Sequence, residues 1–510
     1  MLAKVKSYAL EGLDGYAVNV ELDISSGIPS MEMVGLASTA TKESKERIRS
    51  AVKNSGYKYP LKRITVNLAP ADTKKEGPVF DLAIAVALLR ADEQFTGQTY
   101  KDYVFLGELS LDGRLSRING VMPILISAYQ KGYRKFVIPY DNRAEAAYIK
   151  GAEVYALKDL GEVDALLSCS GAFSPVEHAD YAPRTGKNPY GVDFSDIKGQ
   201  TAAKRAIEVA VSGGHNVLMI GPPGTGKTML SRSIPSIMPD MTFEEALEVT
   251  KIHSIAGVLD SEEGIITQRP FRTPHHSATL PSLIGGGQKS RPGEVSLAHY
   301  GVLFLDEMPE YSRHTLESLR QPLEDKCVTV ARAMRTVSYP SAFMLVASMN
   351  PCPCGNLGSK TAECTCTAQQ IRNYLSKLSG PLLDRIDIQI EVDNLTYEEI
   401  TGKVSGDSSE TVKERINNVR RIQAERFRGT PVLTNAQMNG RQLEEFCRTD
   451  AQCDALLKSA FKRLNLSARA TTRILKVART VADMEGSENI KAAHLAEAIQ
   501  YRSLDRKLNV

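Results

Sequence analysis

A glycine-rich stretch near the middle of the chain has the residue types that bind phosphate. It reads GPPGTGKT and lies between the apolar run NVLMI and a helical pattern, the context that a phosphate-binding loop requires. Its glycines let backbone N–H groups surround the phosphates, and the N-terminus of the following helix adds favourable partial charge. The sequence therefore predicts an ATP site, with a ligand-free turn as the alternative, formed by Gly221, Pro222, Pro223, Gly224, Thr225, Gly226, Lys227 and Thr228.

Four side chains are suited to the chemistry of ATP hydrolysis. We expect Lys227 to reach the β- and γ-phosphates and Thr228 to bind Mg²⁺. The apolar run GVLFL ends in Asp306 and Glu307. Because phosphoryl transfer depends mostly on positioning and charge stabilisation, we expect Asp306 to hold the Mg²⁺ shell and Glu307 to orient or deprotonate the attacking water. Acids at the end of a buried strand are common, so it is the phosphate loop that favours this catalytic interpretation.

Three further polar residues are candidates for contact with the nucleotide. Asn350 ends the apolar run AFMLVASM and can donate to the γ-phosphate or to the water beside Glu307, although it can also cap a turn. Arg385 lies in LLDRID and Arg469 in SARATTR. An arginine side chain is planar and can pair with a phosphate through two hydrogen bonds. An ordinary surface ion pair is the alternative for each arginine.

Four of the eight cysteines lie within fifteen positions, directly after the run that ends at Asn350. This clustering does not resemble a disulfide framework in so long a chain. Four thiolates suit tetrahedral Zn²⁺, although the C-x-C spacing is tighter than usual. We expect structural zinc, with four reduced thiols in an ordinary loop as the alternative, at Cys352, Cys354, Cys364 and Cys366.

Composition places the chain among ordinary globular proteins. It has 510 residues, with 42% hydrophobic and 24% charged residues, and its length suggests several domains. The net charge of +3 gives no global basic field, so any nucleic acid must be bound by local basic loops. No signal peptide and no apolar run of membrane-spanning length is present, and we expect a cytoplasmic protein without a membrane partner.

The motifs divide among segments of different periodicity. Residues 1–170 mix β-like runs with helical patterns and predict an α+β domain, and the Pro- and Gly-rich residues 171–190 predict a linker. Residues 191–395 alternate apolar strands with helices, which is typical of a parallel sheet covered on both faces. Residues 396–510 are almost entirely helical in pattern. The fold class is thus α/β, with an α+β domain before it and a helical domain after it.

Long motifs give the chain a specific resemblance. RPFRTPHHSATLPSLIGGGQKSRPGEVSLAHYGVLFLDEMPEY, NPCPCG and GPLLDRID resemble the ComM/YifB family of Mg-chelatase-like AAA+ ATPases, as does VGLASTATKESKERIRSA near the N-terminus. The resemblance implies a Lon-protease-like domain of the ribosomal S5 domain 2 type, an AAA+ core and a helical lid. It also implies that Asn350 is sensor 1, Arg469 is sensor 2 and Arg385 is an arginine finger acting on a neighbouring subunit. Activity would then need a ring, which we expect to be a homo-hexamer.

The N-terminal domain departs from active Lon peptidases at the catalytic positions. Those enzymes have Ser after Gly-Pro, whereas this chain has Val79, and the expected Lys falls near Met122. Because a serine nucleophile needs a nearby base, we expect a scaffold without peptidase activity. Ser55 or Lys53 is the remote alternative.

An inserted segment between the Asp306/Glu307 strand and the Asn350 strand predicts a hairpin with Arg332-Ala333-Met334-Arg335 at its tip. In related ring motors a hairpin at this place projects into the central pore, where Arg332 and Arg335 would meet a DNA backbone without reading bases. Solvated arginines on a turn are the alternative. Lys251, His253 and residues 255–270 are candidates for a second pore loop.

Three functions fit these motifs. The resemblance favours an ATP-driven DNA motor, a helicase or branch-migration enzyme of recombination or natural transformation, acting on single-stranded or branched DNA. A Mg-chelatase-type subunit that remodels a metal-insertion partner is the second hypothesis, and a nucleotide-gated scaffold or chaperone is the third. The Lon-like domain and the CPCG loop favour the first of these.

Overall fold

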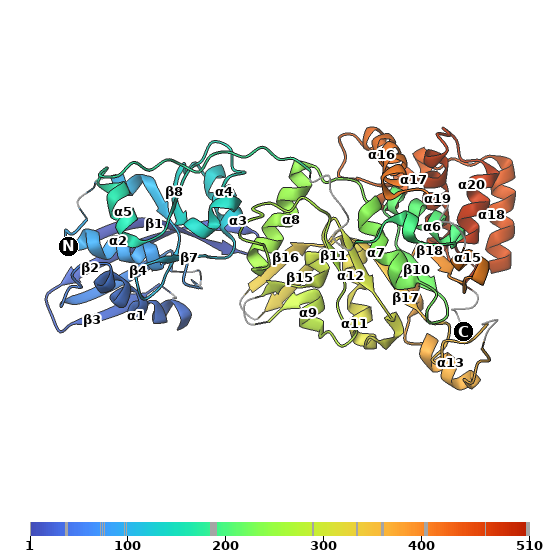
Figure 1. The fold of residues 1–510 in the computed structure, drawn as a ribbon, viewed down its shortest axis with the longest axis horizontal. Helices are drawn as coiled ribbons and strands as arrows, with labels where there is room; N and C mark the ends of the chain where they lie inside the picture. The colour runs from blue at the N-terminus through green and yellow to red at the C-terminus, as the bar shows by residue number, and fades with distance from the viewer. Residues whose placement is uncertain are drawn as a thin grey trace. The chain divides into compact units, whose positions relative to one another are not determined.

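The chain is described from a computed structural model, shown in Figure 1. The description covers residues 2–35, 39–71, 73, 75, 77–95, 97, 99–183, 191–287, 290–332, 335–358, 362–401, 406–464 and 466–505. Two compact units are present: Met1–Ala182 with Thr242–Thr267, and Pro183–Met241 with Gln268–Val510. The chain therefore crosses between the units three times. Of the predicted linker, residues 184–190 lie outside the described residues.

The first unit is an α+β domain built on a seven-stranded mixed sheet of order β3-β4-β2-β1-β5-β8-β9. The long β1–β2 hairpin alternates exposed and buried side chains, which fixes the face that it turns to the core. Helix α2 is apolar and buried along almost its whole length. The strands are β1 (Leu2–Glu11), β2 (Asp14–Ser25), β3 (Ser30–Val34), β4 (Arg63–Ala69), β5 (Tyr103–Phe105), β8 (Lys135–Pro139) and β9 (Glu153–Leu157), with a small β6 (Glu108–Leu109) and β7 (Leu115–Ser116) pair. The helices are α1 (Thr39–Asn54), α2 (Asp81–Ala91), α3 (Val121–Gln130), α4 (Arg143–Ala146) and α5 (Leu160–Leu167).

One segment of the predicted 191–395 range packs in the first unit. It contains α8 (Phe243–Ala256), which begins with a capping box at Thr242 and ends at Gly257. Ser254 Oγ donates to the buried Glu145 carboxylate at 2.6 Å, and the Gly120 amide donates to the Ser254 carbonyl at 3.1 Å. Arg117 donates to the Leu259 carbonyl at 2.7 Å. Lys251 and His253 thus lie on a helix whose last turn is bonded to the N-terminal domain.

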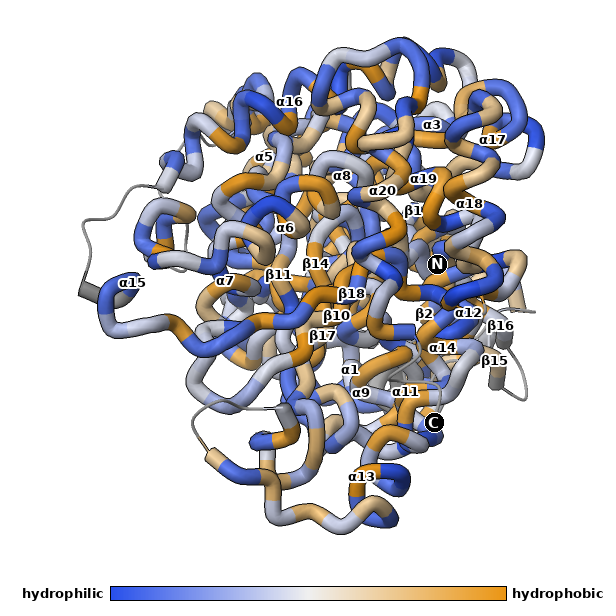
Figure 2. The backbone as a smooth tube through the Cα atoms, turned by 90° about the vertical axis from the view of Figure 1, so that its right-hand side faces the viewer, coloured by the Kyte–Doolittle hydropathy of each residue, from blue (hydrophilic) through white to orange (hydrophobic). Residues whose placement is uncertain are grey.

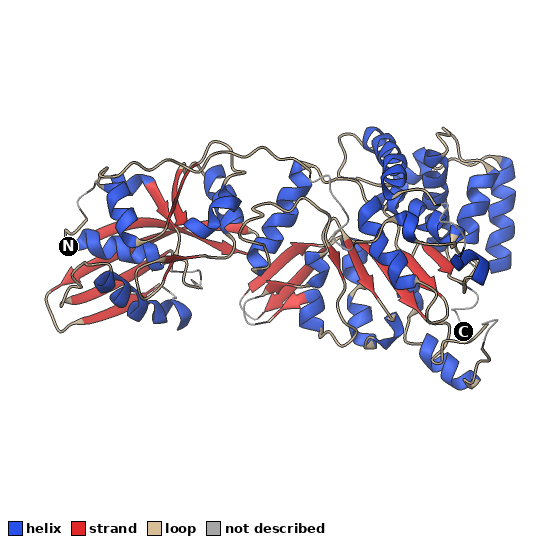
Figure 3. Cartoon of the chain, viewed as in Figure 1, coloured by secondary structure: helices blue, strands red, loops and turns tan. Residues whose placement is uncertain are grey.

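The second unit is built on a five-stranded parallel sheet of order β11-β14-β17-β10-β18. Figure 3 shows helices on both sides of this sheet, which explains why β10 and β14 are wholly apolar. These two strands appear orange in the hydropathy colouring of Figure 2. The strands are β10 (Val217–Ile220), β11 (Phe271–Arg272), β14 (Val302–Leu305), β17 (Met344–Met349) and β18 (Ile388–Glu391).

Helices and two hairpins surround this sheet. The hairpins are β12 (Gly285–Gly286) with β13 (Arg291–Pro292), and β15 (Cys327–Arg332) with β16 (Arg335–Pro340). The helices of the sheet region are α6 (Thr201–Gly213), α7 (Lys227–Ile237), α9 (Leu280–Ile284), α10 (Glu294–Leu297), α11 (Arg313–Ser318), α12 (Arg320–Asp325), α13 (Ala368–Leu375) and α14 (Gly380–Leu383). The C-terminal helices are α15 (Tyr397–Thr401), α16 (Ser409–Arg426), α17 (Gly440–Phe446), α18 (Ala451–Leu464), α19 (Ala468–Met484) and α20 (Ala492–Gln500).

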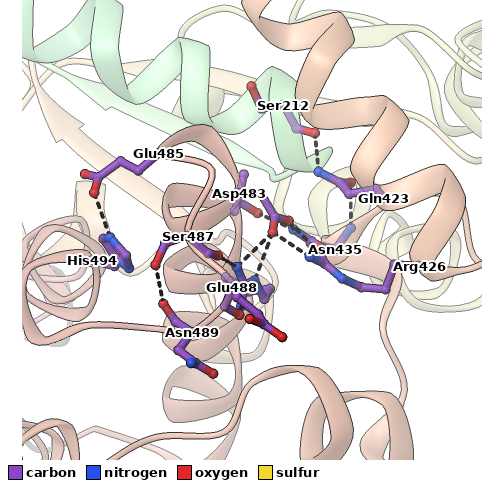
Figure 4. Close-up of polar contacts among 12 residues, drawn as sticks. Ser212, Gln423, Arg426, Asn435, Asp483, Glu485, Ser487, Glu488, Asn489 and His494 are labelled. Carbon is purple, nitrogen blue, oxygen red and sulfur yellow. Dashed lines mark hydrogen bonds and ion pairs between the residues drawn. The ribbon is translucent and has the colours of Figure 1, made fainter.

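A buried polar network joins the C-terminal helices to one another and to α6 (Figure 4). The Asp483 carboxylate accepts from Arg426 Nη1 at 2.6 Å and from Asn435 Nδ2 at 2.8 Å. Gln423 accepts from the Asn435 amide at 3.0 Å and donates to the Ser212 carbonyl of α6 at 3.0 Å. Because these buried side chains bond to one another and to the Ser212 carbonyl, the network fixes the C-terminal helices against α6.

Candidate active site

The phosphate loop lies at the carboxyl edge of the parallel sheet, between β10 and α7. Gly224 and Gly226 have φ angles of +80° and +88°, in the left-handed region that only glycine adopts without strain. A side chain at Gly221 would lie 2.2 Å from the Val392 carbonyl. Helix α7 begins at Lys227, so its free N–H groups face the loop. The local geometry is that of an anion site.

Asp306 and Thr228 meet beside this loop, as their predicted Mg²⁺ role requires. Thr228 Oγ1 donates to Asp306 Oδ2 at 3.0 Å. The buried Ser348 of β17 donates to the other carboxylate oxygen. A hydroxyl and a carboxylate are oxygen ligands of the kind that Mg²⁺ prefers, so these residues fit the metal. Sequence reasoning missed Ser348, whose partner across the sheet is visible only in the fold.

Glu307 stands in a strained conformation next to Asp306. Its φ is +50°, which is uncommon outside glycine, and its side chain is exposed. The Glu307 amide donates to Asp306 Oδ1 at 3.1 Å and to Ser348 Oγ at 3.4 Å, which holds the turn. Strain of this kind gathers at functional sites, where it sets the direction of a side chain.

Lys227 and Asn350 lie together at the phosphate loop. Lys227 Nζ donates to the Gly221 and Pro222 carbonyls at 2.7 and 2.8 Å and to Asn350 Oδ1 at 3.3 Å. Burial lowers the pKa of Lys227, while Asp306 and Glu307 act in the opposite direction. The structure therefore brings five predicted site residues together at the ends of three neighbouring strands. They are Lys227, Thr228, Asp306, Glu307 and Asn350.

Two predicted arginines gather at a different carboxylate, that of Glu324. Arg385 is buried and donates to Glu324 and, at 2.6 Å, to the Pro381 carbonyl. The Arg385 hydrogen bond lowers the pKa of Glu324, and the charge of Arg469 contributes. Arg469 is exposed at the start of α19, whose cap residue Ser467 donates to Asp384 at 3.4 Å. Among the described residues, the bonds of Arg385 do not include the phosphate loop.

Asp387, the last residue of the LLDRID motif, is a buried anchor. It accepts from Arg473 and from the Asn216 amide, the latter at 2.9 Å. Although burial opposes ionisation, Arg473 and His215 hold the pKa of Asp387 well below its usual range. This ion pair joins α19 to the start of β18 and so sets where Arg469 lies.

The four clustered cysteines come together in space. Their sulfur atoms all lie within 4.8 Å of one another, at Cys352, Cys354, Cys364 and Cys366. Cys352 is buried, and the Leu357 amide donates to its sulfur at 3.3 Å. Amides of Asn356 and Thr365 lower the pKa of Cys354 to about 5. Four convergent sulfurs fit a tetrahedral zinc ion.

The predicted insertion is an antiparallel hairpin, β15–β16. Its register pairs Val330 with Val337 and ends with Arg332 opposite Arg335. Ala333 and Met334 at the tip lie outside the described residues. At the base, the Ser341 amide donates to the Lys326 carbonyl at 2.8 Å. The two arginines therefore stand at the far end of a paired ribbon.

The catalytic positions of Lon peptidases hold apolar side chains in this structure. Val79 is half-buried and precedes α2, and Met122 is fully buried in the first turn of α3. Lys53 is exposed near the end of α1, and Ser55 is half-buried just after it. The geometry at the two matching positions offers neither a nucleophile nor a base.

One further residue contacts the phosphate loop from the start of the second unit. Gln200, just before α6, has a φ of +51°. Its Nε2 donates to the Thr225 carbonyl at 3.4 Å and to the Asp393 carbonyl at 2.7 Å. A pocket of about 450 Å³ opens beside the same segment and includes Ile197 and Gly199 in its lining. The sequence offered only a DIKGQ pentapeptide here, which sequence analysis did not single out.

Comparisons with known proteins agree over the whole chain. The family model described as magnesium chelatase, subunit ChlI, matches residues 193–400, its C-terminal model matches residues 406–502, and the model for subunit ChlI of Mg-chelatase matches residues 20–142. No helix in the described part of the chain is long and apolar enough to cross a membrane.

Two similar proteins match this chain over nearly their full length, and a third matches over one segment. YifB of Escherichia coli K12 is 42% identical over 509 residues, 99% of this chain and 98% of that protein. Competence protein ComM of Haemophilus influenzae is 42% identical over 514 residues, with the same shares. A Lon protease of Acinetobacter baumannii is 27% identical over 175 residues, 32% of this chain and 21% of that protein. The chain thus has an AAA+ fold with a Lon-protease-like part, and it belongs to the ComM/YifB family of Mg-chelatase-like AAA+ ATPases.

Proposed function

We propose that this ATPase is a ring motor that moves DNA through its centre, in helicase or branch-migration reactions of recombination or natural transformation. One observation carries the proposal: the β15–β16 hairpin is inserted between the strand that ends at Asp306 and the strand that ends at Asn350. These strands are neighbours in the sheet, so a change at the γ-phosphate has a route to the hairpin from each of them, through α11 and α12 from the Asp306 side. The name of the Haemophilus relative, a competence protein, supports DNA as the track. A cytoplasmic location fits such a substrate.

The residues around the phosphate loop divide the work of ATP hydrolysis. Lys227 and the loop amides neutralise and hold the phosphates. Thr228 and Asp306 would hold Mg²⁺, which when bound offsets phosphate charge, and Ser348 keeps the Asp306 carboxylate in place. Glu307, exposed beside this pair, orients the attacking water and takes up its proton. Asn350 lies against Lys227 and senses whether the γ-phosphate is present.

The arginines support a ring, which we propose is a homo-hexamer. Arg385 and Arg469 lie together at Glu324 instead of at the phosphate loop of their own chain. A neighbouring subunit would bring its ATP to this pair, with Arg385 stabilising the charge that develops during transfer. Glu324, which is exposed, would give up Arg385 when the phosphate arrives.

The DNA contact is proposed at the hairpin tip. Arg332 and Arg335 are paired in the backbone register, which places both residues at the same end of the ribbon. A phosphate backbone is the partner that such a pair suits, because arginine binds phosphate without reading bases. Binding of this kind depends on salt and tolerates any sequence, as a translocating motor requires.

We also propose that zinc is bound by the four cysteines. Its role is structural because four thiolates close the coordination shell and leave no position for a substrate. Metal analysis of the purified chain checks this directly, with about one zinc per chain expected.

The second candidate is a Mg-chelatase-type subunit that remodels a metal-insertion partner, and the chelatase family models favour it. A nucleotide-gated scaffold or chaperone is the third. ATPase assays with and without single-stranded and forked DNA separate the three. Stimulation by DNA supports the motor, and turnover that ignores DNA in assembled protein contradicts it.

A further inference from the structure

The cysteine loop touches the phosphate loop directly. Gly355 follows Cys354 and has a φ of +84°. A Cβ atom at Gly355 would lie 2.6 Å from Cδ and 2.8 Å from Cγ of Pro223, the second proline of GPPGTGKT. The backbone of the CPCG turn therefore lies against the Pro223 ring, at a distance that only glycine permits.

The cysteine loop is also fastened beside Asn350. Cys352 comes two residues after Asn350 and is completely buried. The chain then returns through Cys364 and Cys366 into α13, whose Tyr374 is buried. Asn350 in turn contacts Lys227. The loop thus meets the ATP site at two points, the Pro223 ring and the Asn350 strand end.

In the described part of the cysteine loop, the contacts between its two halves centre on the sulfur atoms. The Gly355 amide donates to the Cys352 carbonyl at 3.0 Å, which closes the first turn. The Cys354 amide reaches across to the Cys366 sulfur at 3.4 Å. Sulfur–sulfur approaches of 3.7 Å, from Cys352 and Cys354 to Cys364, also join the halves. A cation bound by all four sulfurs would convert this weak closure into a fixed one.

We propose that the metal-bound cysteine loop is a brace that holds the phosphate loop in its ATP-binding conformation. This proposal rests on the zinc site proposed above and is independent of DNA. The loop residues that bind ATP are glycine-rich and would otherwise sample many conformations, so a rigid neighbour lowers the cost of ordering them. Metal occupancy then sets nucleotide affinity although no cysteine touches the nucleotide.

The test compares zinc-loaded and zinc-stripped wild-type chain, with zinc content measured by elemental analysis. Affinity for a non-hydrolysable ATP analogue with Mg²⁺ is expected to fall roughly tenfold on stripping, the scale of coupling between residues in contact. Amide hydrogen exchange of residues 221–228 should become faster while that of α20 stays unchanged. Cys354→Ser should behave like stripped protein, and Cys169→Ser, at an exposed cysteine of the first unit, should behave like wild type.

Pro223→Ala separates the brace from a general loss of folding. This variant should keep its zinc, bind the analogue less tightly than wild type, and lose little further affinity when it is stripped, because the contact that transmits the effect is already gone. An equal loss on stripping in wild type and Pro223→Ala would overturn the brace. So would unchanged affinity after stripping, and so would purified protein that neither contains nor takes up zinc.

Discussion

Arg385→Ala tests whether Arg385 has a catalytic role or only a structural one. The contacts of this side chain set an upper bound on the free energy that it contributes to folding. Its partner Glu324 has a side chain that is 57% exposed, so losing that ion pair costs about 0–1 kcal/mol. Losing the donor to the Pro381 carbonyl costs about 1–3 kcal/mol. An arginine finger contributes about 10³–10⁵ in turnover, on the order of 4–7 kcal/mol of transition-state stabilisation. The catalytic loss should exceed the structural one.

The expected result is normal ATP-analogue binding, a lower unfolding midpoint that reflects a loss of about 1–4 kcal/mol, and turnover reduced by about 10³ or more. Glu324→Gln is the matched control. It removes the carboxylate that holds Arg385 but leaves the guanidinium, so turnover should stay within a few-fold of wild type.

Mixing decides whether Arg385 acts across a subunit boundary. Arg385→Ala subunits retain Lys227, and Lys227→Ala subunits retain Arg385, so mixed rings contain some sites with both. ATPase activity should therefore recover when the two inactive proteins are combined. If mixed rings are confirmed by mass spectrometry and no ratio restores turnover, the trans assignment is wrong.

Three further predictions test the remaining parts of the account. Lys227→Ala should abolish nucleotide binding, whereas Glu307→Gln should bind ATP, stall hydrolysis and accumulate rings seen by light scattering; wild-type turnover in Glu307→Gln would refute the role of that carboxylate. Ser254→Ala removes the hydrogen bond to Glu145 and should weaken the packing of α8 by about 1–3 kcal/mol. Hydrogen exchange should then become faster in α8 and stay unchanged in α5. Burial lowers the pKa of Lys326 from 10.5 to about 8, so between these pH values the unfolded chain binds one proton that the folded chain does not. The unfolding midpoint of the wild type should therefore rise from pH 8 to about 10.5 relative to that of Lys326→Met. Unfolding midpoints that change equally with pH in the two proteins would contradict this.

The sequence predicted those parts of the site that are formed by short motifs or by the ends of neighbouring parallel strands. A phosphate loop needs its glycines in order, and acids or amides at the ends of neighbouring apolar strands converge because parallel strands share one edge. Lys227, Asp306, Glu307 and Asn350 could be placed together for this reason. The cysteine cluster was predictable because its spacing is local.

The missed features depend on contacts between distant segments. Ser348 is a buried polar residue in an otherwise apolar strand, so the sequence gives no sign of its partner. Only the pairing of β14 with β17 shows that it meets Asp306. Glu324, which gathers the two arginines, lies 61 positions before Arg385. Helix α8 has no local sequence pattern that ties it to the N-terminal domain, with which it packs in the fold. Domain boundaries and the site roles themselves stay predictions.

The salt dependence of DNA binding tests the motor most directly. Wild-type chain, assembled with Mg²⁺ and an ATP analogue, should bind single-stranded and forked DNA of unrelated sequences with similar affinity. Replacing Arg332 and Arg335 by alanine should lower the slope of log affinity against log salt by about one to two units and leave basal ATPase activity intact. An assembled wild-type ring that binds neither DNA at low salt would contradict the DNA-motor proposal.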